Sequence, residues 1–181
     1  MTGLDPRSLT EAITAWHDFY NVLGEAAATM IALLFVAASV GSDRFAGSRA
    51  TALRMFLSAS VVHFASVLTI SLLTLTPLHD WTIFGSLIIA AGLFGLFYAI
   101  FTWFGAVRDG LSKRIDREDR IWYAALPILG ALLECAAGVG LLLHLFCALP
   151  ALAIAAGFLM LIAIHNAWDI TIWSIATPPK E

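Results

Sequence analysis

Five long stretches of apolar residues, separated by short polar breaks, dominate the pattern along the chain. They cover residues 19–41, 55–76, 81–107, 121–143 and 151–177. A bilayer core of about 30 Å needs about 20 mostly apolar residues in each helix that crosses it. The pattern therefore predicts an all-α integral membrane bundle of five transmembrane helices. Because the connecting segments are short, we expect consecutive helices to lie antiparallel in a single domain over residues 1–181.

A further helical segment is predicted before the first span. Ser8 and Glu11 have the spacing of a capping box, and an apolar stripe at helical spacing follows, made of Leu9, Ile13, Trp16 and Tyr20. We expect a short helix at the outer membrane interface that leads into the first span. The alternative is a signal peptide, which needs a positively charged start and a short apolar core. Residues 1–18 are instead net acidic, which favours an uncleaved span.

The composition supports a membrane protein. Hydrophobic residues make up 60% of the chain and charged residues 13%, with a mean hydropathy of +0.88, whereas soluble domains contain about 45–50% apolar and about 25% charged residues. This excludes a soluble enzyme, a disordered chain and a disulfide scaffold. A net charge of −3 gives no basic surface for nucleic acid. We expect Cys135 and Cys147 to be free thiols, because their spacing along a helix is too great for a disulfide.

Positive charge is distributed unevenly between the connecting segments. The first and third connections hold eight cations, Arg44, Arg49, Arg54, Arg108, Lys113, Arg114, Arg117 and Arg120. The second and fourth connections hold none, Lys180 follows the last span and Arg7 precedes the first. The positive-inside rule therefore predicts an N-out, C-in orientation. Four tryptophans near span ends are predicted interface anchors, Trp81 on the outer side and Trp103, Trp122 and Trp173 on the inner side.

Small residues at four-residue spacing are expected to bring the helices close together. They are Gly24, Ala28 and Ala32 in the first span and Ala91, Gly95 and Ala99 in the third. Pro127 lies early in the fourth span, where its missing N–H and its ring are predicted to kink the helix.

Six polar residues within the spans are the candidates for a functional site. They are Glu25, His63, Glu134, His165, Asn166 and Asp169. A charged side chain at the bilayer centre costs about 2.5–3.5 kcal/mol on insertion scales, so each should face the bundle interior and find a partner. The i, i+4 spacing pairs Asn21 with Glu25 and His165 with Asp169, whereas Glu134 has no such partner. Each residue also has a structural interpretation, as a packed polar group or one that reaches interfacial water.

Several segments resemble a family of small bacterial polytopic inner-membrane proteins. They are W-H-D-F-Y at 16–20, G-E-A-A-A-T at 24–29, L-L-F-V-A-A-S at 33–39 and I-H-N-A-W-D at 164–169. Members more usually have Gly or another small residue where this chain has Glu25. The resemblance implies a bacterial origin and an inner-membrane location, and it implies no particular chemistry.

The motifs of common soluble enzymes, such as G-x-S-x-G, Walker A and H-E-x-x-H, do not occur in the sequence. We therefore predict a non-enzymatic membrane protein without catalytic residues, metal or cofactor. Its expected partners are the lipid bilayer and either a second copy or another membrane protein that it binds or modulates. Nucleic acid is not among them.

Two alternative functions remain open at this stage. Glu134, His63 and the pair of His165 with Asp169 have the chemistry of a proton-coupled or ion-transport relay. A membrane redox protein is the other alternative, with haem held by two histidine pairs, His63 with His165 and His79 with His144. The same alternative includes a metal held by Glu25, His63, Glu134, His165 and Asp169.

Overall fold

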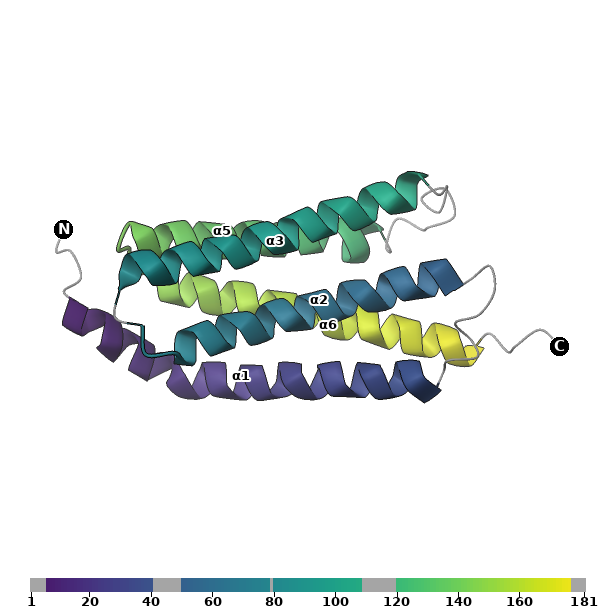
Figure 1. The fold of residues 1–181 in the computed structure, drawn as a ribbon, viewed down its shortest axis with the longest axis horizontal. Helices are drawn as coiled ribbons and strands as arrows, with labels where there is room; N and C mark the ends of the chain where they lie inside the picture. The colour runs from purple at the N-terminus through teal and green to yellow at the C-terminus, as the bar shows by residue number, and fades with distance from the viewer. Residues whose placement is uncertain (1–5, 41–49, 79, 109–119, 177–181) are drawn as a thin grey trace.

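The computed structural model describes residues 6–40, 50–78, 80–108 and 120–176, and every long element in them is helical. The elements are α1 (Pro6–Val40), α2 (Ala50–Leu75), α3 (Trp81–Arg108), a π-helical turn η3 (Ile121–Ala125), α5 (Leu126–Leu142) and α6 (Ala148–Ala176). Five of the helices are long and apolar enough to cross a membrane. The predicted all-α bundle with five membrane-spanning helices is therefore confirmed (Figure 1).

The helices run lengthwise beside one another, with the start of α1 and the end of α6 at opposite ends of the bundle (Figure 1). α2 and α6 form its centre: α2 packs against α1, α3 and α6, and α6 also packs against α5. α3 and α5 pack against each other more extensively than any other two helices of the described chain. α1 lies at the edge of the bundle, where it packs mainly on α2 and touches α6 to a smaller extent.

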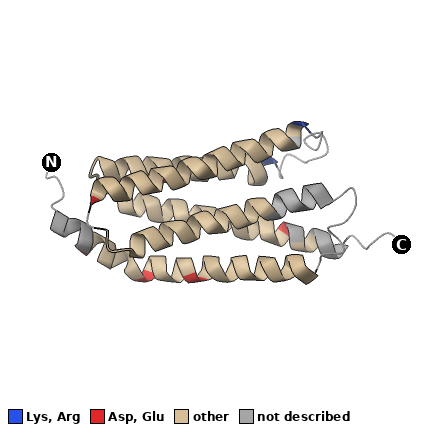
Figure 2. Cartoon of the chain, viewed as in Figure 1, with Lys and Arg blue, Asp and Glu red and all other residues tan. Residues whose placement is uncertain are grey.

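The ends of α1, α3 and α6 lie together with the starts of α2 and η3 (Figure 1). Arg108 and Arg120, which are exposed, lie at this same end (Figure 2). The described helix ends that flank the predicted cytoplasmic segments thus lie at one end of the bundle. The other cations used for the orientation lie outside the described side chains, and which end faces the cytoplasm stays a prediction.

The N-terminal segment is helical and leads into the first span, as predicted, and its position at the membrane interface stays a prediction. α1 is a single helix that continues from Pro6 into the first span without a break. Ile13 and Trp16 pack against the core and Tyr20 is fully buried, so the apolar stripe faces the bundle. The stripe continues in helical register through Ala27 and Leu34, which are also buried, and an unbroken helix keeps all these residues on one side. The side chains of Ser8 and Leu9 lie outside the described residues.

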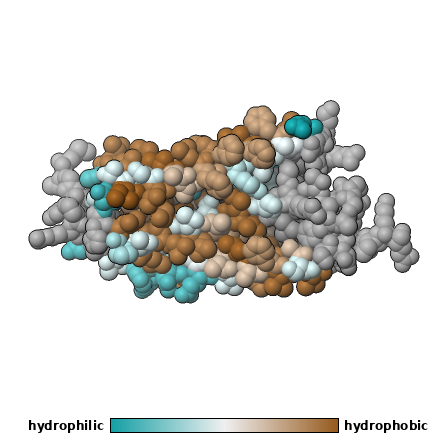
Figure 3. All heavy atoms as spheres, viewed as in Figure 1, coloured by the Kyte–Doolittle hydropathy of each residue, from teal (hydrophilic) through white to brown (hydrophobic). Residues whose placement is uncertain are grey.

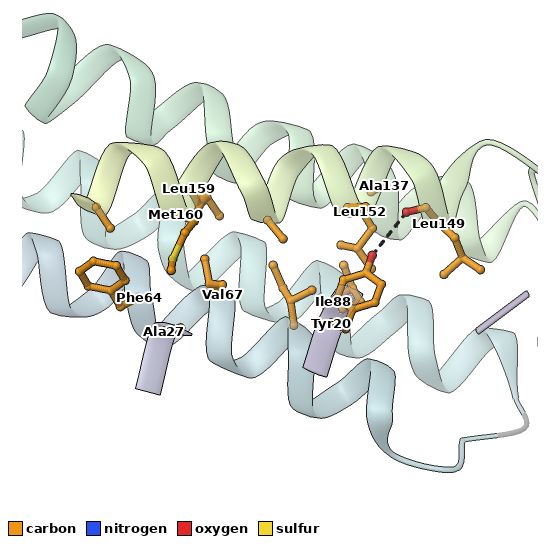
Figure 4. Packing of buried hydrophobic residues seen from close by; sticks show 14 of the residues in the cluster. Tyr20, Ala27, Phe64, Val67, Ile88, Ala137, Leu149, Leu152, Leu159 and Met160 are labelled. Carbon is orange, nitrogen blue, oxygen red and sulfur yellow. Dashed lines mark hydrogen bonds between the residues drawn. The ribbon is translucent and has the colours of Figure 1, made fainter. Parts of the chain in front are cut away.

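The core between α1, α2 and α6 is built from interlocking apolar side chains (Figure 4). Tyr20 from α1 enters this core, where its hydroxyl donates a hydrogen bond to the carbonyl oxygen of Leu149, 3.4 Å away. Phe64 and Val67 of α2 meet the α6 residues Leu159 and Met160 further along (Figure 4). A shared apolar core thus joins α1, α2 and α6.

Glycines bring α3 and α5 into backbone contact. A Cβ on Gly138 would lie 3.0 Å from the Ile89 nitrogen and 3.1 Å from the Gly85 oxygen, and one on Gly92 would lie 3.1 Å from the Cys135 nitrogen. The predicted small-residue stripe of the third span is buried at Gly95 and Ala99. The stripe of the first span divides: Gly24 packs on Ser71 of α2, whereas Ala28 and Ala32 are exposed.

Pro127 lies in the first turn of α5, directly after the π-helical turn η3. In that turn the backbone N–H of Leu126 donates to the carbonyl oxygen of Ile121, five residues earlier. Since Pro127 has no N–H to offer a carbonyl four residues before it, the chain adjusts by widening this turn. The structure shows a π-helical turn directly before Pro127, and the predicted kink stays a prediction. Pro150 similarly fits the first turn of α6, which lets that helix begin three residues before the predicted start.

Candidate functional site

The structure does not gather the six candidate residues into one cluster. Hydrogen bonds or ion pairs link Asn21 to Glu25 and His165 to Asp169. Within the described parts of the chain, no such interaction joins any two others of the candidates. The described residues also contain no group of three or more His, Cys, Asp or Glu side chains able to hold a metal ion. Each candidate is therefore considered in its own surroundings.

Glu134 is the most deeply placed of the candidate carboxyl groups. Its side chain in α5 is 0% exposed, and neither carboxyl oxygen has a hydrogen-bond partner. The neighbours along its own helix face are small and buried: Gly130, Ala131, Ala137 and Gly138. Small apolar neighbours offer no donor to a carboxylate, and a buried charge without a partner is strongly disfavoured. Glu134 thus has no partner on its own helix, as the spacing of polar residues predicts.

Asn166 and His63 are also buried, at 0% and 4% exposure. The side-chain Nδ2 and Oδ1 of Asn166 have no hydrogen-bond partner, although its backbone carbonyl accepts a hydrogen bond of 3.3 Å from the Tyr123 hydroxyl. Sequence reasoning did not link Tyr123 to this position, because the contact depends on how η3 packs against α6.

His165 and Asp169 form the pair predicted from their spacing. The distance between His165 Nε2 and Asp169 Oδ2 is 3.1 Å, and the two side chains are 30% and 38% exposed. The Trp122 ring stacks on the His165 ring with centroids 3.6 Å apart and an interplanar angle of 21°. Trp122 was predicted to be an interface anchor. It covers a histidine at the end of the bundle, because the π-helical turn η3 brings it beside α6, and its role as an anchor stays a prediction.

Trp81 lies at the opposite end of the bundle, as predicted, but it does not face lipid. Its side chain is 5% exposed, its Nε1 has no partner, and its ring stacks on His144 with centroids 5.6 Å apart. It therefore packs within the bundle and is not an exposed anchor. His79, the other histidine proposed for haem ligation at this end, lies outside the described residues. Both cysteines are free, as predicted.

Glu25 departs from the expectation that every charged residue of a span faces inward. It is exposed on α1, where its Oε1 accepts a hydrogen bond of 3.2 Å from Asn21 Nδ2. The physical reason lies in the opposite side of the same helix. Tyr20, Gly24 and Ala27 fill the contact with the bundle, which turns Asn21 and Glu25 outward.

We name five of the exposed residues on this outward side of α1 the α1 outer face; the side continues beyond them to Phe35 and Val36, which are also exposed. The five residues are Asn21, Glu25, Ala28, Thr29 and Ala32. The Thr29 hydroxyl donates to the Glu25 carbonyl oxygen of its own helix at 2.8 Å. Ala28, Thr29 and Ala32 all have small side chains. In the space-filling view, hydrophilic side chains gather over α1 beside a predominantly hydrophobic surface (Figure 3).

The other membrane-spanning helices expose large apolar side chains, as α1 also does at Val22, Phe35 and Val36. Examples are Phe94, Phe97 and Phe101 on α3, Leu132 and Leu133 on α5, and Ile154 and Leu161 on α6. Burial separates α1 from them, since 17% of its candidate span is buried, against 33 to 56% for the other four. Neighbouring residues lie about 100° apart around a helix. A helical projection with Tyr20 and Gly24 turned toward the bundle would therefore have placed Glu25 on the uncovered side and indicated the α1 outer face from sequence.

The length and hydropathy of the helices define the chain as a multi-pass membrane protein. No protein-family model, curated protein or solved structure matches it. The properties of its own residues therefore carry the functional argument.

Proposed function

We propose that this chain is a non-enzymatic protein of the bacterial inner membrane, oriented N-out and C-in, that acts by associating with a membrane protein through the α1 outer face. One observation carries the proposal: the hydrogen-bonded pair of Asn21 and Glu25 lies on the side of a membrane-spanning helix that the bundle leaves uncovered. The sequence resemblance and the distribution of cations support the location and the orientation.

The membrane around this pair favours a protein partner. Lipid tails offer no hydrogen bonds, so polar groups within a membrane seek partners in protein or water. Hydrogen bonds between membrane helices contribute about 0.6 kcal/mol each on average, so several of them together favour one helix face over another. Ala28 and Ala32 lie further along the α1 outer face, and small residues allow two helices to approach closely. The pair supplies specificity and the alanines supply contact.

The proposal is tested by photo-crosslinking in native membranes. A photoreactive amino acid placed at Ala28 or Ala32 is expected to give a discrete protein adduct. The same group at Ala90 or Ala136, exposed alanines of α3 and α5, provides the matched control and is expected to label lipid only. Absence of protein adducts from both α1 positions would contradict association through this face.

A second candidate function is proton transfer through the bundle, which one observation favours. Glu134 is a fully buried carboxyl group whose oxygens have no partner, and intramembrane acids of this kind often mark proton paths. If Glu134 carries protons, purified protein in liposomes should dissipate a pH gradient, and Glu134→Gln should abolish this flux. A flux absent from the wild type, or unchanged in Glu134→Gln, rejects this candidate.

A further inference from the structure

We propose that the partner of the α1 outer face is a second copy of this chain, so that two bundles meet through their α1 helices in a two-fold symmetric dimer. The inference rests on the association proposed above and specifies its partner. A symmetric dimer uses the same surface of both copies, and such a surface must be complementary to itself.

Asn21 and Glu25 have the required complementarity. The Asn21 amide carries two N–H donors, and in one chain it donates to Glu25 Oε1 of the same helix. The second N–H remains available to the carboxylate of another copy, and a carboxylate can accept several hydrogen bonds. A two-fold axis beside α1 repeats each bond, so each chain donates to the partner's carboxylate and accepts from the partner's amide. The two carboxylates are then each held by two amides.

The residues that follow allow the backbones to approach. Ala28 and Ala32 lie one and two turns beyond the polar pair on the same face and are exposed. The spacing is that of small residues at close helix crossings, and this bundle already uses small residues in such a contact between Gly85 and Gly138. The Thr29 hydroxyl is bonded within its own helix, so it brings no unsatisfied donor into the contact.

The position of α1 leaves room for a second bundle. α1 lies at the edge of the molecule, packed mainly on α2 (Figure 1), so its outward side can be reached without displacing another helix. The large apolar side chains exposed on α3, α5 and α6 are suited to lipid tails and lack this combination of a donor, an acceptor and small residues. The α1 outer face is therefore the side on which two copies fit.

Disulfide trapping tests the dimer in native membranes. In a Cys135→Ser, Cys147→Ser background, Ala28→Cys is produced as two co-expressed copies with different tags and oxidised with copper phenanthroline. A two-fold contact sets position 28 opposite its own copy, and a disulfide requires Cα atoms within about 7 Å. The expected product has twice the chain mass and contains both tags. Ala90→Cys, on an exposed position of α3, is the matched control and is expected to stay monomeric.

Second-site variants identify the contacts that hold the copies together. Ala32→Ile is expected to reduce the Ala28→Cys dimer at least about fivefold, because the larger side chain separates the helices, whereas Ala136→Ile on α5 should leave it unchanged. Asn21→Leu should reduce the dimer because it removes both amide donors. Glu25→Gln should retain it, because the amide oxygen still accepts. A dimer that is insensitive to both Asn21→Leu and Ala32→Ile overturns the proposed contact.

The possible partners give different products. An adduct of Ala28→Cys with another protein, without a doubly tagged dimer, overturns the second copy as partner but leaves the association through the α1 outer face intact. If the photoreactive amino acid gives no protein adduct at position 28 or at position 32, both proposals are overturned. Equal dimer yields from Ala28→Cys and Ala90→Cys indicate random collision and overturn the dimer.

Discussion

The Tyr20 hydroxyl of α1 donates a hydrogen bond to the carbonyl oxygen of Leu149, which lies in the first turn of α6. The Tyr20 side chain is completely buried, so this bond joins two otherwise weakly connected helices inside an apolar core. It also fixes the rotation of α1. With Tyr20 turned inward, Asn21 and Glu25 must point outward, and the α1 outer face follows from this orientation.

We expect Tyr20→Phe to destabilise the protein by about 1 kcal/mol. The phenyl ring keeps the apolar contacts, and only the hydrogen bond to Leu149 is lost. Tyr20→Ala should destabilise it by about 3–5 kcal/mol, since it also leaves a cavity. Reversible unfolding in mixed micelles, followed by circular dichroism, measures both values. Equal losses for the two variants would show that the hydroxyl, and not the ring, dominates this contact.

Replacing Gly138 tests the backbone contact of α3 with α5. A Cβ at this position would lie 3.0 Å from the Ile89 nitrogen, so we expect Gly138→Val to force the helices apart and to destabilise the protein by about 1–3 kcal/mol or more. Gly157→Val on α6 is the matched control, because a Cβ there meets nothing within 4 Å. The same unfolding measurement compares the two variants, and similar losses would contradict the close approach.

The helices could be predicted from sequence because lipid imposes a simple rule on length and hydropathy. The local pair of His165 with Asp169 was also predictable, since helical spacing alone brings the two side chains together. The surroundings of Trp122, Trp81 and Glu25 were not predictable by the same means. They depend on which side of each helix meets its neighbours, and hydropathy that is high all round a helix gives little indication of that side.

We expect the stability of the first turn of α3 to fall at acidic pH because of Asp80. Its Oδ1 accepts hydrogen bonds from the backbone N–H groups of Thr82 at 2.7 Å and Ile83 at 3.1 Å. These bonds, with that from Ile83 as the largest cause, hold the pKa of the Asp80 carboxyl below its ordinary value of 3.8. A lowered pKa in the folded state means that Asp80 stabilises the protein above pH 3.8, and that this contribution is lost as the pH falls through the folded-state value.

We therefore expect Asp80→Ala to increase amide hydrogen exchange in the first turn of α3 at neutral pH, because the ionised cap is removed. The difference from wild type should shrink as the pH falls below 3.8, when wild-type Asp80 also becomes protonated. Exchange measured by mass spectrometry, corrected for its intrinsic pH dependence, reports this local change. Asp80→Asn should be intermediate, because its oxygen still accepts from the backbone. A difference that is constant with pH would exclude ionisation of Asp80 as the cause.

Glu134→Leu should stabilise the bundle by about 1–3 kcal/mol. Both carboxyl oxygens of Glu134 are buried without partners, and leucine removes this penalty at similar volume. Glu134→Gln keeps a buried polar group and should change stability less. Unfolding in mixed micelles gives the ranking. A stability loss in Glu134→Leu would mean that the carboxyl group has a favourable partner in the membrane-embedded protein.

The orientation of the bundle can be tested with a native cysteine. Cys147 is exposed in the turn before α6, whereas Cys135 is partly buried within α5, with its Sγ 4.0 Å from the Ile89 carbonyl oxygen. In the proposed orientation this turn faces outward, so a membrane-impermeant maleimide should label intact spheroplasts. Cys147→Ser should abolish the labelling and Cys135→Ser should not. Labelling of Cys147 only after the membrane is permeabilised would reverse the orientation and place the first and third connections outside, against the positive-inside rule.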